Sequence, residues 1–160
     1  MPGIEQDVRG LKERDNGIAH ACLKRLERQS AQGDAVYAFW DAFVAMLEDG
    51  HSYVRTRGLQ MLAANARWDT GQKVEAVLPA YCAHILDEKP ITARQCIQHL
   101  AKLVEGKPQL VSYARQALCQ ADVSRYADSM QPLLRRDVQK ALAQLDEQIL
   151  PEVEQGDQKM

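Results

Sequence analysis

The sequence predicts an all-α fold of helical hairpins, and three observations lead to this expectation. Apolar residues recur at the i, i+3, i+4, i+7 spacing of an amphipathic helix, as in Val36, Phe39, Trp40, Phe43, Val44 and Leu47. No segment shows sustained alternation of apolar and polar residues, so no β-strand is expected. Glycines and prolines fall between the periodic segments, where helices begin and end. The length of 160 residues, of which 46% are hydrophobic, fits one domain with its own core.

Eight helices are expected along the chain. They span about residues 4–14, 17–31, 34–49, 51–67, 71–87, 91–105, 109–121 and 129–149. Ser52 and Thr70 are suitable N-caps for the fourth and fifth helices, and Pro79 is expected to kink the fifth because it lacks an N–H group. One domain therefore covers residues 1–150, and residues 151–160 are expected to fray because they have little to bury.

The even-numbered helices repeat one another. The spacing i, i+4, i+8 occurs in Ile18, Cys22 and Leu26; in Val54, Gly58 and Leu62; in Thr92, Cys96 and Leu100; and in Leu134, Val138 and Leu142. Each hairpin has an apolar stripe that it cannot cover alone, and side-by-side stacking buries a continuous core, as in an α-solenoid. The alternative fold, a four-helix bundle, would also show the helical period, but it does not require this spacing to recur in every second helix. Leu62 and Leu100 are expected to be equivalent core positions, and the small middle residues should let paired helices approach closely.

The residues of the fourth helix resemble a known repeat. The stretch SYVRTRGLQML at 52–62 looks like the second helix of a HEAT repeat, in which a Val-Arg pair is followed by a small residue and then a Leu. Leu134-Arg135 fits the same opening, whereas Thr92-Ala93 departs from it. The blocks at 52–69 and 87–100 also resemble small bacterial HEAT-like proteins, some labelled SufBD-like. The resemblance covers about residues 16–149 and implies an armadillo-type α-α superhelix, a fold typical of scaffolds and binding surfaces.

The cysteines and histidines suggest a metal site only at first sight. Cys82, His84, Cys96 and His99 are the ligand types that zinc prefers. Positions two apart differ by about 200° around a helix, so Cys82 and His84 cannot face one ion. The sequence also lacks a G-x-S-x-G elbow, an HExxH pair and a glycine-rich phosphate loop. We therefore expect no metal, no cofactor and no enzymatic activity.

The charge pattern predicts a binding surface. The formal net charge is only −2, yet the even-numbered predicted helices together carry +6. In HEAT arrays the second helix of each pair lines the concave side, so the inner face is expected to be mildly basic and to attract anionic partners. The function predicted is a non-enzymatic protein-binding or scaffold module whose partner has an acidic segment. The alternatives are a HEAT-like DNA glycosylase or other nucleic-acid-binding protein, and a cofactor-handling lyase or chaperone helper.

A stripe on the fourth helix is the candidate binding surface. Arg57, Met61, Asn65 and Trp68 lie at i, i+4, i+8 and i+11, and Arg94, Gln95 and His99 lie at or near the matching positions of the next repeat. We expect the arginine to bind an acidic group, the amide to bind backbone, and the methionine and tryptophan to make apolar contacts. Arg55 is instead expected to be structural and to reach an acidic group or a helix-end carbonyl of a neighbouring repeat.

The remaining expectations concern the surroundings of the chain. No apolar run approaches the ~18–20 residues of a membrane helix, and the start of the chain does not look like a secretory signal. These features predict a cytoplasmic protein without a membrane partner. A terminal hairpin with an uncovered apolar face could pair with a second copy, so a monomer or a weak homodimer is expected.

Overall fold

The computed structural model describes the backbone of residues 3–158 and the side chains of residues 3–149. Within that range the chain forms eight α-helices and no β-strand, which confirms the all-α class. The α-helices are α1 (Ile4–Gly10), α2 (Asn16–Gln32), α3 (Trp40–Met46), α4 (Ser52–Asn65), α5 (Lys73–Cys82), α6 (Pro90–Leu103), α7 (Pro108–Gln120) and α8 (Gln131–Gln158). Short 3₁₀ helices extend or connect them: η1 (Val36–Phe39), η2 (Ala66–Trp68), η3 (Ala83–Leu86) and η4 (Val123–Arg125).

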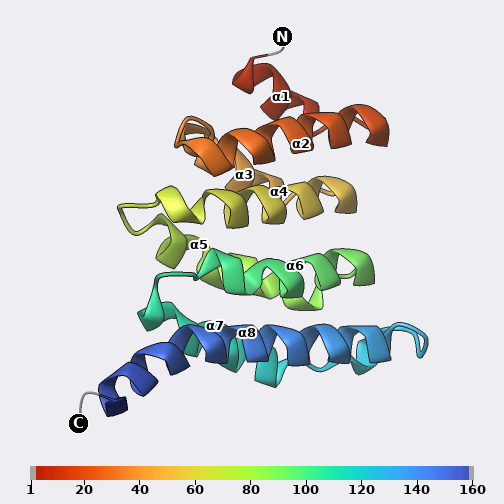
Figure 1. Cartoon of the computed structure of the whole chain (residues 1–160). Coiled ribbons are helices and arrows are strands. Elements are labelled where there is room, and N and C mark those ends of the chain that lie inside the picture. Colours follow the sequence, from red (N-terminus) through yellow and green to blue (C-terminus); the bar gives the residue numbers. More distant parts are fainter. Residues whose placement is uncertain (1–2, 159–160) are drawn as a thin grey trace.

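The helices lie in two rows (Figure 1). The helices α2, α4, α6 and α8 lie side by side in the nearer row, and α3, α5 and α7 lie behind them. Helix α1 packs on α2, α3 packs on α4, and α7 packs on α8. We call the nearer row the even row. It exposes one broad face that all four of its helices share.

Several predicted boundaries need correction. The segment 34–49 forms η1 followed by α3, and the segment 71–87 forms α5, which contains Pro79, followed by η3. The N-cap of α4 is His51 rather than Ser52, and its Nδ1 accepts a hydrogen bond from Tyr53 N at 3.3 Å. The side chain of Thr70 does not cap α5. Helix α8 continues to Gln158, into the segment predicted to fray, and the side chains of that segment lie outside the described residues.

The core follows the predicted register in the middle of the stack and departs from it at the ends. Leu26, Leu62 and Leu100 are all fully buried, which confirms that Leu62 and Leu100 are core positions. Ile18, at the first position of the register, is instead 52% exposed, and Leu142 is only partly buried. The physical reason is that α2 and α8 have a neighbour in the even row on one side only.

Gly58 lies where α4 packs closely against α3. A Cβ atom added at this position would lie 2.9 Å from the Cβ of Met46 and 3.0 Å from the carbonyl oxygen of Phe43. Real Cβ atoms essentially never come as close to another heavy atom as the 2.9 Å to Met46, and the second neighbour is backbone, which cannot rotate away. The small residue predicted at this position therefore does permit close approach of the paired helices.

Two buried carboxylates tie neighbouring hairpins together. Asp69, before α5, accepts hydrogen bonds from Tyr37 Oη at 2.7 Å and from Val74 N at 2.9 Å, and it lies 3.7 Å from Lys107 Nζ. Asp87, before α6, accepts two hydrogen bonds from Arg55, at 2.8 and 3.0 Å. Burial acts to raise the pKa of both groups, but the hydrogen bonds to each carboxylate outweigh it, so both pKa values lie below the usual range.

Candidate functional site: the groove between α4 and α6

The predicted binding stripe on α4 is not a surface. Met61 and Asn65 are fully buried, and Arg57 is only 7% exposed. The reason is that α4 lies between α2 and α6, so the side of α4 that carries this stripe packs against α2. The expectation of an exposed ligand surface at Arg57, Met61 and Asn65 is therefore wrong.

Arg57 has a structural role that the sequence assigned only to Arg55. Its Nη1 donates to the carbonyl oxygen of Leu11 at 2.9 Å, and its Nη2 donates to Asn16 Oδ1 at 3.1 Å. Burial lowers the pKa of Arg57. The prediction for Arg55 is confirmed, because its guanidinium reaches Asp87 of the neighbouring hairpin. Both arginines of the stretch 52–62 thus hold hairpins together.

The side chains of Asn65 and Trp68 also form hydrogen bonds within the fold. The Nδ2 of Asn65 donates to Ser30 Oγ at 3.1 Å, and the indole N–H of Trp68 donates to the carbonyl oxygen of Ser30 at 2.7 Å. The two side chains therefore fasten α4 and η2 to the end of α2. Trp68 remains partly exposed, and the guanidinium of the exposed Arg67 lies 5.0 Å from the centre of its ring.

The three predicted residues of α6 differ in their surroundings. Arg94 makes an ion pair with Asp137 of α8 at 2.6 Å. The Nδ1 of His99 lies 2.8 Å from the carbonyl oxygen of Gln95, one turn earlier in the same helix. Of the seven predicted site residues, Gln95 is the one that lines the groove described next.

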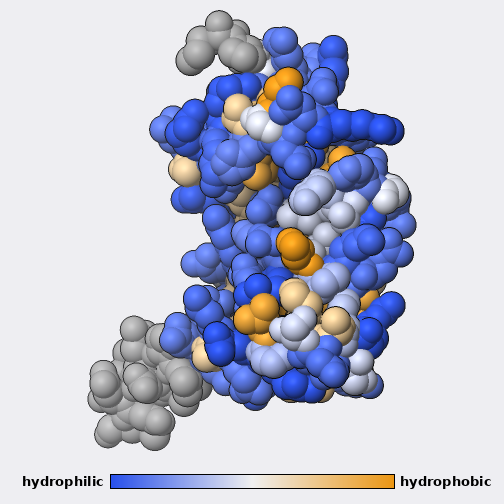
Figure 2. Space-filling view, turned by 90° about the vertical axis from the view of Figure 1, so that its right-hand side faces the viewer, coloured by the Kyte–Doolittle hydropathy of each residue, from blue (hydrophilic) through white to orange (hydrophobic). Residues whose placement is uncertain are grey.

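A groove of about 460 Å³ lies between the first halves of α4 and α6. We call it the α4–α6 groove; its lining residues are Ser52, Tyr53, Thr56, Gln60, Lys89, Pro90, Ile91, Thr92 and Gln95. Tyr53 is 48% exposed and Ile91 is 60% exposed, so two large hydrophobic side chains face solvent here. Figure 2 shows the side of the molecule on which α4 and α6 begin, with hydrophobic residues scattered among hydrophilic ones.

Paired polar groups connect the two walls of the groove. The hydroxyl oxygens of Thr56 and Thr92 lie 2.9 Å apart, and Gln60 Nε2 donates to Gln95 Oε1 at 3.2 Å. This amide–amide bond leaves Gln60 Oε1 as an acceptor and the Gln95 amide as a donor. An exchange of the oxygen and nitrogen positions in both amides would still leave one donor and one acceptor. The pair can therefore bind a peptide unit, which offers one N–H and one C=O.

Sequence reasoning missed Tyr53 and Ile91. Both fall in the first helical turn, 38 residues apart, which is the interval between Val36 and Val74 in the odd-numbered helices. The available signal was a large apolar residue at the same position of two neighbouring helices of the even row, just before the buried stripe. The buried stripe by itself does not indicate a binding role for that position.

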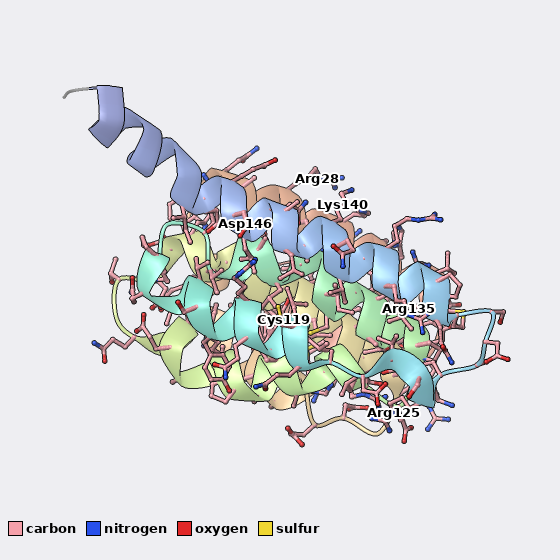
Figure 3. All side chains as sticks on the ribbon, turned by 90° about the horizontal axis from the view of Figure 1, so that it is seen from below. Arg28, Cys119, Arg125, Arg135, Lys140 and Asp146 are labelled. Atoms are coloured by element: carbon pink, nitrogen blue, oxygen red, sulfur yellow. The ribbon has the colours of Figure 1, made fainter. Side chains whose placement is uncertain are left out.

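The exposed charges of the even row are more basic than acidic. Its exposed cations include Lys24, Arg28, Lys102, Arg135, Arg136 and Lys140, and its carboxylates include the exposed Glu147 and the partly exposed Glu27 and Asp146. In Figure 3, Arg28 of α2 and Lys140 of α8 project along the same edge of the molecule, although they belong to opposite ends of the stack. Glu27 lies 3.6 Å from Lys24. The described residues of the even row thus carry a small excess of exposed cations over exposed carboxylates.

The thiols of Cys82 and Cys96 and the imidazole of His84 are engaged in the fold. Burial raises the pKa of Cys82 to about 12 and raises the pKa of Cys96 well above its usual value, so neither is a thiolate at neutral pH. The Nδ1 of His84 lies 2.7 Å from Asp87 Oδ2. Among the described side chains, no three His, Cys, Asp or Glu residues gather in a group that could hold a metal ion.

No known protein-family model, curated protein or solved structure matches this chain. In the described part of the chain, every helix is too short or too polar to cross a membrane.

Proposed function

We propose that the chain is a short HEAT-like α-solenoid that binds an extended segment of another protein in the α4–α6 groove. The support for the architecture is the two-row stacking of helices together with the repeated register of Leu26, Leu62 and Leu100. The observation that carries the binding role is the exposure of Tyr53 and Ile91 on the two walls of one groove. Exposed large apolar residues that line a groove are typical of interaction sites.

The groove suits a peptide in an extended conformation. An apolar side chain of the partner would pack between Tyr53 and Ile91, and a main-chain peptide unit would hydrogen-bond to Gln60 and Gln95. The exposed Lys89, which is part of the groove lining, favours an acidic residue beside the apolar anchor. The role is recognition rather than catalysis.

A peptide-display selection tests this function. Random short peptides are selected on the wild-type protein, and the enriched peptides are measured by fluorescence anisotropy against wild type and Ile91→Glu. Loss of an apolar contact worth ~1.5–3 kcal/mol weakens binding by about tenfold or more. Raised salt should weaken binding further, because exposed charges are screened.

Tyr113→Glu is the matched control, because Tyr113 is also a large hydrophobic residue, 46% exposed, but lies on α7 outside the groove. Circular dichroism confirms that each variant is folded. Equal affinity of the selected peptides for wild type and Ile91→Glu would rule out the groove as their binding site.

A further inference from the structure

The stack ends in a face formed by α7 and α8, which Figure 3 views directly. A groove of about 410 Å³ runs between these two helices, and its apolar lining includes Leu118, Val123, Val138 and Leu142. No other helix of the described residues packs over this face. In the middle of the stack, the corresponding sides of α4 and α6 are covered by the next helix of the even row.

One stripe of α8 combines apolar residues with two opposite charges. Arg135, Val138, Leu142 and Asp146 lie at i, i+3, i+7 and i+11, so they share one side of the helix. Arg135 is exposed, Val138 and Leu142 are partly buried, and the side chain of Asp146 is 46% exposed. Figure 3 shows Arg135 and Asp146 toward opposite ends of the face.

This arrangement is self-complementary. If two copies of α8 pack antiparallel about a two-fold axis, the charge at one end of the stripe meets the opposite charge of the other copy. The midpoint between Arg135 and Asp146 falls between residues 140 and 141, and the midpoint between Val138 and Leu142 falls at residue 140. A single register therefore brings Arg135 opposite Asp146 and, at the same time, Val138 opposite Leu142.

We propose that a second copy of this chain covers the α7–α8 face through an antiparallel contact between the two α8 helices. Arg135 of each copy pairs with Asp146 of the other, and Val138 and Leu142 form the apolar centre. Within one copy, Asp146 already accepts a hydrogen bond from Arg115 at 2.8 Å, and Arg135 donates to Gln131 at 2.9 Å. Asp146 then lies between two arginines, and the carboxylate of Asp122 faces Arg135 from the α7 side. The dimer leaves the α4–α6 groove open and does not depend on the proposed function.

Sedimentation analysis over a range of protein concentrations tests the dimer. The apparent mass of the wild type should rise toward twice the monomer mass as its concentration increases. Leu142→Asp should remain monomeric throughout, because it places two carboxylates in the apolar centre. Lys140→Glu is the control, since Lys140 lies on the even-row side of the same helix and should leave dimer formation unchanged.

Charge reversal tests the register. Arg135→Asp alone and Asp146→Arg alone should each be monomeric, because like charges then meet at both ends of the contact. An equimolar mixture of the two variants should form a heterodimer, in which both ends again pair opposite charges. Circular dichroism checks that both variants are folded. A monomeric wild type at every concentration, or variants that dimerise alone as the wild type does, would overturn the proposal.

Discussion

Replacement of Asp87 by Asn should destabilise the fold by about 3 kcal/mol. The side chain of Asp87 is 3% exposed and that of Arg55 is 9% exposed, and two short hydrogen bonds join them. Removal of one partner from a buried ion pair costs ~3–5 kcal/mol, because the other charge is left unpaired. Asn keeps one acceptor oxygen, which places the expected loss at about the lower end of that range.

Urea denaturation followed by circular dichroism measures this loss. For a domain of this size, a loss of about 3 kcal/mol lowers the melting temperature by about 6–12 °C. Asp41→Asn is the matched control, because Asp41 is 92% exposed and lies 4.0 Å from Lys73, so its removal should cost ~0–1 kcal/mol. The double variant Asp87→Asn, Arg55→Met should lose less than the sum of the two single variants.

Two results would show that the ion pair does not stabilise the fold. A change within about 0.5 kcal/mol for Asp87→Asn is what an unimportant surface position would give. Strict additivity of the two single variants would show that Arg55 and Asp87 do not stabilise each other.

Two further predictions concern the helix contact and the response to acid. Gly58→Ala should destabilise the fold by ~1–3 kcal/mol, because the new Cβ overlaps the α3 backbone; this exceeds the gain of ~1 kcal/mol in helix propensity. Gly50→Ala is the control and should be nearly neutral, because the space around Gly50 is open. Thermal melts of the two variants distinguish these outcomes. Because the folded pKa values of Asp69 and Asp87 are lowered, their stabilisation is complete above the unfolded value of about 4 and is lost as the pH falls through the folded values. The urea concentration at the midpoint of unfolding should therefore decrease when the pH is lowered below about 4. An equal decrease in the Asp87→Asn variant would contradict the role of that carboxylate.

The helices and much of the core could be predicted because apolar spacing records burial. Leu62 and Leu100 follow the register and are fully buried. The departures lie where another force competes with periodicity. Asp69, and not the predicted Thr70, accepts the hydrogen bonds of backbone N–H groups near the start of α5, because a buried carboxylate can accept several hydrogen bonds at once. The sequence does not show which of two nearby polar residues is buried, because burial of this kind depends on contacts with residues 32 or more positions away.

The candidate site was harder to predict than the fold for a related reason. The stripe of Arg57, Met61 and Asn65 lies beside the buried stripe, and the helical period alone gives it the appearance of a surface. The stripe is covered because α2 packs against α4. The spacing of apolar residues within a single helix does not show on which side of that helix a neighbouring helix lies. Tyr53 and Ile91 lie on the open side of the same helices. Only the arrangement of the rows separates these two sides.

The reach of Asp69 and Asp87 has a consequence for how the stack comes apart. Asp69 contacts Tyr37 from the second hairpin and Lys107 at the start of the fourth, and Asp87 binds Arg55 through its side chain and the Tyr126 hydroxyl through its carbonyl oxygen. In a linear array, each unit ordinarily interacts only with its immediate neighbours, and ends can detach one at a time. Here each of the two aspartates contacts both the second hairpin and the fourth. Loss of the last hairpin therefore weakens the second, so amide protons from α3 to α8 should exchange through one common opening rather than in a gradient from the ends.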